Sequence, residues 1–188
     1  MEAAVLKATF VRTAGERDWI YVTRSDGSEV SWSFPTYGDG LPHDLVHLVV
    51  EACCGLRSGF WGRVDAGADP RLINAAANRA GGRQKYAAFG PEQAELHVAE
   101  ALAGVAWWLE GATHEQLEES VAVQCRRLGV PVPDLSPEKT ARIRSTLARL
   151  ARRWAESVPK GSLSVTFRTD RLEESCHGLS NVDDAAEQ

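Results

Sequence analysis

The sequence predicts an α+β fold, in which a small antiparallel sheet packs against a bundle of about four to five helices. Segments with alternating apolar and polar residues lie near both ends of the chain, whereas the interior carries apolar residues at helical spacing. The 188 residues, 44% of them apolar and 25% charged, suffice for one domain with a single core. We therefore expect one domain over residues 1–169 and an acidic disordered tail over residues 170–188.

Four segments are predicted to form the sheet, namely residues 5–12, 19–23, 30–34 and 163–168. The two middle segments flank Asp26-Gly27, a pair that favours the tight turn of a hairpin. The last segment is expected to join the N-terminal hairpin, so that both ends of the fold meet in one sheet. Because Val30, Trp32 and Phe34 share one face of their strand, we expect helices to cover that face.

Turn and capping residues divide the interior into predicted helices. Pro42 suits a first helical turn, and Gly55 suits a helix end. Thr113 begins a capping box, and Ser136 is an N-cap before a first-turn proline. The predicted helices cover residues 42–54, 70–80, 91–110, 114–128 and 137–158.

The charge pattern argues against a nucleic-acid partner. The formal net charge is −5, but the residues from 170 onward hold six acids against the single Arg171, so the rest of the chain is close to neutral. No apolar stretch approaches the roughly 20 residues needed to cross a bilayer, and there is no pattern of a secretory leader. We expect a cytoplasmic protein with a small-molecule substrate and no nucleic-acid or membrane partner, and we leave a homodimer open.

The four cysteines, Cys53, Cys54, Cys125 and Cys176, are predicted to be structural thiols. Cys53 and Cys54 point about 100° apart on a helix and cannot easily bridge each other. No CxxC pair is present in the sequence, so a sulfur-rich structural zinc site has no support.

The helix predicted over residues 42–54 carries a narrow polar stripe. The stripe consists of His43, Asp44, His47 and Glu51. At about 100° per residue these side chains share roughly one 100° arc, and almost everything else on the helix is apolar. A helix that is apolar nearly all round is normally buried, so its stripe must face a partner, a cavity or an ion.

The stripe predicts a metal site. Histidines at i and i+4 can bind one ion, so His43 and His47 are the expected ligands, with Asp44 as a candidate third. Glu51 lies about 12 Å along the helix axis from His43, too far to share that ion. We therefore assign Glu51 as a general base, as a partner that orients a ligand, or as a ligand to a second metal.

Further candidates lie outside the stripe. His97 and Glu100, at i and i+3 on the helix predicted over residues 91–110, are candidates for the third ligand. Cys54 falls about 20° from His43 on a helical wheel and is expected near the site. Trp61, in an aromatic pair between glycines, suits the wall of a pocket.

These residues also have a structural interpretation. His43 can hydrogen-bond near the helix start while His47 is a satisfied core histidine, and His97 with Glu100 can be a surface pair. The pair Trp107-Trp108 can line an apolar pocket, although aromatic residues more often belong to the core. Two histidines and two acids in one arc of an apolar helix favour the metal.

The same segment resembles two families. Residues 41–51, LPHDLVHLVVE, followed by Gly55-Leu56-Arg57 and Gly59-Phe60-Trp61-Gly62, are similar to a group of small bacterial proteins with an N-terminal hairpin, an HDLxHxxVE helix and no assigned activity. This likeness spans roughly residues 1–69. More loosely, His43-Asp44-x-x-His47 resembles the HDxxH zinc motif of a coenzyme Q biosynthesis family whose members are implicated in ring decarboxylation. That family has a ligating glutamate where Gly59 stands here, so the resemblance extends only to His43, Asp44 and His47.

We therefore expect a metal-dependent enzyme that acts on a small molecule. A divalent ion, with zinc as the first choice, would activate water or polarise a carbonyl, and Asp44 or Glu51 would move protons. Iron, manganese and nickel also suit these ligands. Hydrolysis of a small amide or ester is preferred, and a lyase reaction such as decarboxylation is second. The alternative is a non-catalytic binding or regulatory module whose stripe is a buried polar network.

Overall fold

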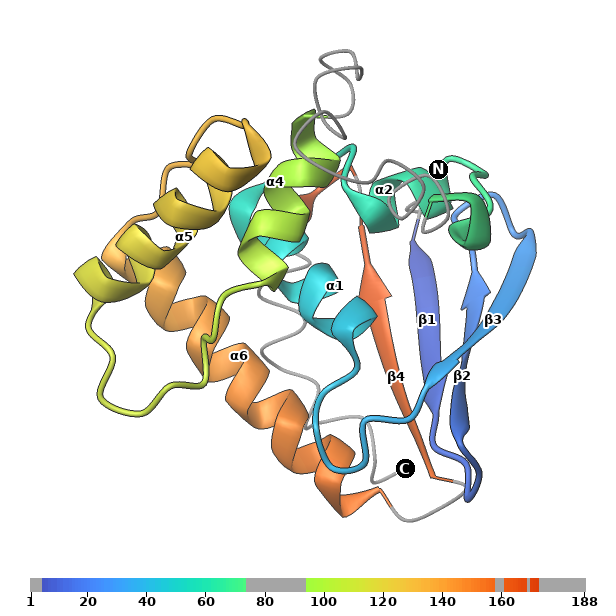
Figure 1. The fold of residues 1–188 in the computed structure, drawn as a ribbon. Coiled ribbons are helices and arrows are strands. Elements are labelled where there is room, and N and C mark those ends of the chain that lie inside the picture. Colours follow the sequence, from blue (N-terminus) through green and yellow to red (C-terminus); the bar gives the residue numbers. More distant parts are fainter. Residues whose placement is uncertain (1–4, 74–93, 158–160, 169, 173–188) are drawn as a thin grey trace.

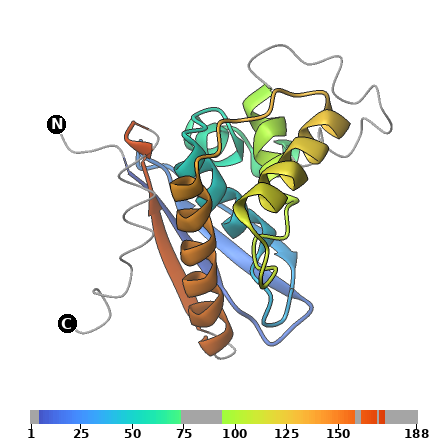
Figure 2. The ribbon, with the colours of Figure 1, turned by 90° about the vertical axis from the view of Figure 1, so that its left-hand side faces the viewer.

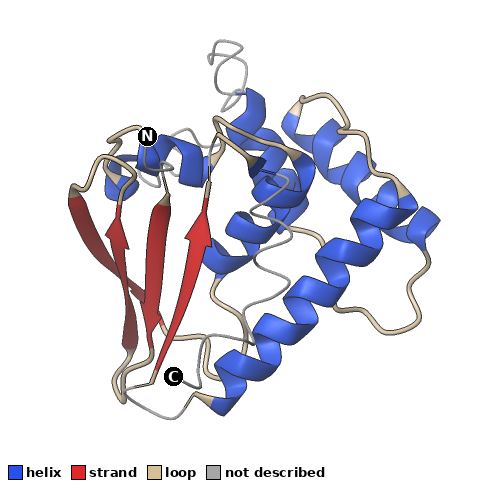
Figure 3. Cartoon of the chain, turned by 180° about the vertical axis from the view of Figure 1, so that it is seen from behind, coloured by secondary structure: helices blue, strands red, loops and turns tan. Residues whose placement is uncertain are grey.

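The computed structural model describes residues 5–73, 94–157, 161–168 and 170–172. Its strands are β1 (Leu6–Val11), β2 (Arg17–Thr23), β3 (Glu29–Pro35) and β4 (Ser162–Phe167), and its helices are α1 (His43–Cys54), α2 (Phe60–Asp65), α4 (Ala94–Ala103), α5 (His114–Leu128) and α6 (Pro137–Glu156). The strands form one antiparallel sheet in the order β3-β2-β1-β4, and the helices lie on one side of it (Figures 1 and 3). The predicted α+β class is confirmed.

The hairpin between β2 and β3 forms at the predicted turn. Gly27 adopts a φ of 85°, which a residue with a side chain rarely does. The turn is also tied to the helical layer, because the Arg24 Nε donates to the Val64 carbonyl at 2.6 Å and the Ser25 amide donates to the Asp65 carboxylate at 2.8 Å. The end of α2 is thereby fixed to the sheet.

The first and last strands pair as predicted. Strand β4 lies antiparallel to β1, with Ala8 opposite Val165, and the Thr9 and Ser164 hydroxyls are hydrogen-bonded at 2.9 Å. Along β4 the residues Leu163, Val165 and Phe167 are buried and their neighbours are exposed. Helix α6 runs along this strand (Figure 2) and contributes Trp154 to the same core.

Helix α1 occupies the middle of the helical layer, where it contacts α2, α4 and α6 (Figure 1). Every residue from Leu45 to Cys53 is buried. The helix ends at Gly55, which has a φ of 73° and whose amide donates to the Glu51 carbonyl. Burial on nearly all sides, expected from the sequence, is therefore confirmed.

Helix α4 is shorter than predicted. The apolar spacing predicted a helix up to residue 110, but α4 ends at Ala103 and residues 104–112 follow a series of turns. The Trp107 side chain explains this end, because its indole Nε1 folds back to donate to the Leu102 carbonyl at 2.8 Å. That contact satisfies a carbonyl that a continuing helix would use. Residues 91–93 of the predicted helix lie outside the described residues.

Where the structure describes them, the other predicted helix boundaries agree with it to within two residues, and α6 ends at Glu156 rather than at residue 158. Thr113 and Gln116 form the capping box of α5, which ends before Gly129, and the Ser136 side chain caps α6. Residues 70–73 are helical, as expected after Asp69, and the rest of that predicted helix lies outside the described residues, as does Val158. Most of the predicted acidic tail also lies outside them.

The structure also tests the predictions for the cysteines and for membrane-spanning helices. Cys53 is disulfide-bonded, whereas Cys54 and Cys125 carry free thiols, so the prediction of four thiols is wrong at Cys53. The adjacent Cys54 points in another direction on the helix, in agreement with the prediction that these neighbours do not bridge each other. Within the described residues, no helix is both long enough and apolar enough to cross a membrane.

The docking of β4 can be tested by truncating a buried residue of that strand. Leu163 is 2% exposed, so Leu163→Ala should lower the free energy of unfolding by about 2–5 kcal/mol. The exposed Thr166, on the same strand, supplies the control. Thr166→Ala should change the free energy of unfolding by no more than about 0.5 kcal/mol. Urea denaturation measures both, and equal effects would contradict the pairing.

Candidate metal centre

The two stripe histidines lie against helix α4. The His43 and His47 rings pack at 4.8 Å between centroids, and the His47 Nε2 lies 3.6 Å from the Glu100 Oε1 on α4. His43, His47 and Glu100 each offer one ligand atom, and these three atoms lie within 4.8 Å of one another. Glu100 was one of the outside candidates for a third ligand. Neighbouring helices therefore bring together the predicted pair and one further carboxylate.

These spacings suit a tetrahedral ion. Two ligand atoms that each lie about 2.0–2.1 Å from zinc are about 3.3 Å apart in a tetrahedral site. The distance of 3.6 Å between His47 and Glu100 is already close to this value, and the ligand atom of His43 lies within 4.8 Å of both. If these three groups bound one ion in tetrahedral geometry, a fourth position would stay open.

Glu51 orients His47 from the side opposite Glu100. The Glu51 Oε1 lies 3.3 Å from the His47 Nδ1, and both side chains are almost completely buried. The same carboxylate accepts backbone hydrogen bonds from Phe60 at 2.9 Å and Trp61 at 3.0 Å, which are the first residues of α2. Glu51 therefore holds the start of α2 and presents the other ring nitrogen of His47 towards Glu100.

The close approach of Glu51 to α2 depends on Gly59. A Cβ atom built at Gly59 would overlap the carboxyl group of Glu51. A glycine before two aromatic residues is typical of a position where another group comes close to the backbone, so the amino-acid pattern carries a signal for this contact. The hydrogen bonds themselves were not predicted.

The charges of the two carboxylates dominate the protonation of His47. Burial alone would lower the pKa of His47, but the hydrogen bonds and charges of Glu100 and Glu51 outweigh burial and raise that pKa to about 10. Desolvation and the neighbouring His47 lower the pKa of His43. His43 therefore keeps a lone pair for a metal at neutral pH, whereas His47 must exchange its proton for the ion.

Asp44 is turned towards the sheet. Its Oδ2 accepts a hydrogen bond from the Trp32 Nε1 at 3.0 Å, and its backbone carbonyl accepts one from the Trp61 Nε1 at 2.7 Å. Burial raises the pKa of the Asp44 carboxyl, and the Trp32 hydrogen bond and the two histidines oppose that rise. Among the described residues, the metal-capable group does not include Asp44.

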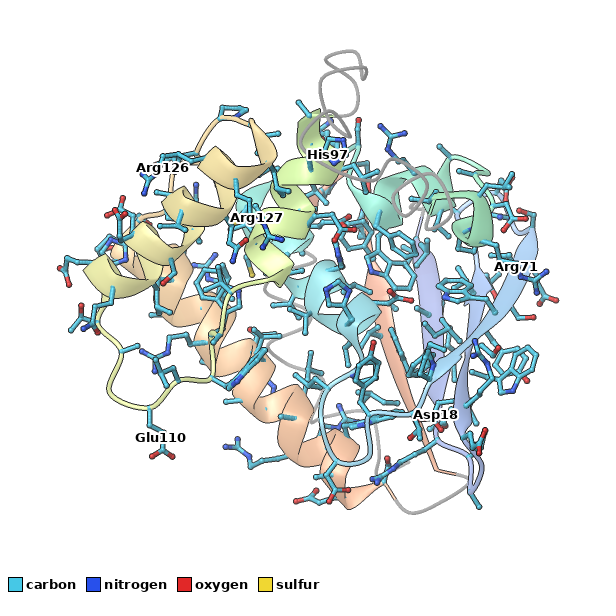
Figure 4. All side chains as sticks on the ribbon, viewed as in Figure 1. Asp18, Arg71, His97, Glu110, Arg126 and Arg127 are labelled. Carbon is cyan, nitrogen blue, oxygen red and sulfur yellow. The ribbon has the colours of Figure 1, made fainter. Side chains whose placement is uncertain are left out.

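Among the described residues, none of the remaining candidates belongs to the group of three ligand atoms. His97 is buried on α4 (Figure 4) and is not part of the metal-capable group. Cys54 lies at the far end of α1, about 16 Å along the axis from His43, and burial raises the pKa of its thiol to about 12. Trp61 is fully buried against Phe10 and Trp32, so it is a core residue.

His43 also lines a cavity of about 1000 Å³. Trp107 and Trp108 line it too, so the pocket interpretation of this pair agrees with the structure, although Trp107 is itself buried. Much of the remaining wall comes from residues 37–41 and from α6, neither of which the sequence pattern singled out as part of a site.

The requirement for glycine at position 59 is testable. Gly59→Ala should lower the free energy of unfolding by roughly 1–3 kcal/mol, because the added methyl group displaces the Glu51 carboxylate. Gly15→Ala supplies the control, because a methyl group at position 15 would make only an ordinary van der Waals contact. In Glu51→Ala/Gly59→Ala the loss should be smaller than the sum of the single losses. Additive losses in urea denaturation would contradict the contact.

The charge on His47 should make its contribution to stability depend on pH. The pKa is raised on folding, from an ordinary 6.5 to about 10. The protonated ring therefore stabilises the fold fully below about pH 6.5, and this contribution is lost as the pH rises through about 10. With a chelator present, the difference in unfolding free energy between the unmodified protein and His47→Gln should shrink over that range. A difference that stays constant with pH would show that His47 is neutral.

No family model, curated protein or solved structure matches the chain. Any functional conclusion therefore depends on the geometry around His43, His47 and Glu100.

Proposed function

We propose that this protein is a metal-dependent enzyme that acts on a small molecule. His43, His47 and Glu100 would bind one divalent ion, with zinc as the first choice, and the mutual approach of their ligand atoms within 4.8 Å supports this proposal most directly. The position of His43, which is exposed and also faces the large cavity, leaves the site open to a substrate. A structural zinc site would instead be closed by four protein ligands.

The ion would supply Lewis acidity, either lowering the pKa of a water molecule or polarising a substrate carbonyl. We assign a positioning role to Glu51, because its carboxylate is fully buried and already accepts two backbone hydrogen bonds besides its contact with His47. Burial raises the pKa of both Asp44 and Glu51. We assign the proton transfer to Asp44, because its carboxyl accepts a hydrogen bond from Trp32, whereas that of Glu51 is held by two backbone amides and His47.

A hydrolase is the preferred reaction class, and a lyase such as a decarboxylase is second. Hydrolysis needs an ion with an open position and an acidic group that can exchange protons, and the proposed roles of the three ligands and Asp44 provide both. Decarboxylation needs the ion mainly to polarise a carbonyl next to the breaking bond. Water incorporation into the product distinguishes these two classes.

A non-catalytic module is the second candidate, and one observation favours it. Without any metal, the protonated His47 already lies between the carboxylates Glu51 and Glu100, so the charges of the network are partly balanced. In that case the stripe would only fix α1 against α4 and α2. Metal analysis separates the two proposals.

Metal content is the first measurement. The full chain, purified without an affinity tag, loaded with zinc and dialysed, should retain about one zinc per chain. His43→Ala should lose most of it, and Glu100→Gln should weaken zinc binding by at least about tenfold. Since the metal replaces the proton of His47, zinc binding to the metal-free protein should tighten as the pH rises from about 6 to 8.

A matched control is available at another helix start. His114 is the first residue of α5, as His43 is of α1, and its ring is hydrogen-bonded to the Thr140 hydroxyl. His114→Ala should therefore leave the zinc content unchanged. A protein that retains no zinc, and whose melting temperature does not respond to added zinc, would support the non-catalytic module instead.

A further inference from the structure

The cavity beside the candidate metal centre has a mostly apolar wall. It lies between the start of α1, the turns after α4, the segment before α1 and one face of α6. Val46, Trp107 and Leu147 contribute apolar side chains to it. Its volume of about 1000 Å³ is at the upper end of the range of ligand pockets, which is about 300–1,000 Å³.

Small residues on α6 leave the space open. Ala141, Ser145 and Ala148 lie at positions i, i+4 and i+7 of α6, and all three line the cavity. Residues with this spacing share one helix face, so their short side chains form one shallow wall. A single larger side chain in this row would occupy part of the volume.

The charged residues of the wall are placed at its rim or are already paired. The Arg144 guanidinium donates to the carbonyls of Ala112 at 2.7 Å and Leu109 at 3.0 Å, so it supports the turns that cover the cavity. Asp39 is largely exposed and pairs with Arg12 at 2.6 Å. Glu110 is exposed and points outward from the same turns (Figure 4). Because the wall is mostly apolar and the Arg144 guanidinium is already hydrogen-bonded, the cavity does not offset the cost of removing an anionic ligand from water.

Exposed apolar residues lie at the opening. The Trp108 side chain lines the cavity and is 65% exposed, and the neighbouring Leu109 is 59% exposed. Tyr37, from the segment before α1, also lines the cavity and is 49% exposed. A ligand with apolar surface would remove these side chains from water, which is favourable at about 25 cal/mol per Å² of apolar area.

His43 belongs to both the cavity wall and the metal-capable group. We propose that the cavity binds an uncharged, largely hydrocarbon molecule with an aromatic or branched body and one carbonyl group, such as an ester or amide, whose carbonyl lies at the His43 end. The position of the carbonyl rests on the proposed function, because a metal at His43 is what would draw it there. The preference for an uncharged apolar body rests on the cavity alone.

Binding to the metal-free full chain tests the cavity by itself. Nile red, a neutral dye with a large apolar body, should bind with a rise in fluorescence, and methyl 2-naphthoate should displace it. The anion 2-naphthoate, which has the same ring system, should displace it at least about tenfold less effectively. Equal displacement by the ester and the anion would overturn the proposal.

Two variants on α6 locate the binding. Ala148→Phe should weaken the binding of both probes by at least about tenfold, because the new ring occupies the cavity. Ala155→Phe places the same ring at an exposed position of α6 that is not part of the cavity wall, and it should bind the probes as the unmodified protein does. Ser145→Leu is a second cavity variant should Ala148→Phe fail to fold. Probe binding that survives in a folded cavity variant would also overturn the proposal.

Zinc loading then distinguishes this inference from the proposed function. If the cavity proposal and the proposed metal centre are both correct, bound zinc should raise the affinity for methyl 2-naphthoate at least about threefold. His43→Ala should abolish this rise. A cavity that selects the ester but does not respond to bound zinc would overturn the placement of the carbonyl. A zinc site that fills without any binding of the ester would overturn the cavity proposal and leave the metal centre intact.

Discussion

The burial of α1 on almost every side is the constraint on which the rest of the structure depends. A helix with apolar residues around its circumference needs neighbours in several directions, and α2, α4 and α6 supply them. The polar side chains of α1 then have little access to water and must find partners inside the protein. His47 and Glu51 do so with each other and with groups from α4 and α2.

The carboxyl group of Glu51 shows how a buried polar group is held: burial raises its pKa, and its contacts with His47, Trp61 and Phe60 oppose that rise. It faces the first backbone amides of α2, where the unpaired N–H groups of a helix start favour an anion, and it also contacts the His47 ring. Two helices meet there, because α1 carries both side chains and Gly59 allows α2 to come close. The same contact fixes which nitrogen of His47 faces Glu100, so structural support and the candidate site share one group.

Local patterns predicted the fold well, and they predicted the candidate site in part. Alternation in the strands and the spacing of His43 and His47 are properties of a few neighbouring residues, so the sequence shows them directly. Glu100 was named as a candidate, but its approach to His47 depends on how α4 packs against α1. The early end of α4 depends on the Trp107 indole reaching back to a carbonyl, and apolar spacing does not report such a contact.

Two other features of the site could not be predicted from the spacing of side chains. They are the backbone donors to Glu51 and the distance along the α1 axis between His43 and Cys54. The hydrogen bonds from Phe60 and Trp61 to Glu51 come from main-chain amides, so Gly59 can indicate a close approach there but not which side chain makes it. Cys54 shares the angular position of His43 on the helical wheel, but it lies several turns away along the axis.

The pairing of β1 with β4 has a consequence for how the chain acquires its structure. The Thr9 and Ser164 hydroxyls that meet across these strands are 155 positions apart, so their contact is among the most distant that this chain can make. During synthesis on the ribosome, β1 would emerge long before β4, and it would keep one unpaired edge until β4 had been synthesised. The unpaired edge of β1 would be a binding site for a chaperone during synthesis. The pairing of β1 with β4 should form slowly compared with the contacts of a helical bundle of similar size.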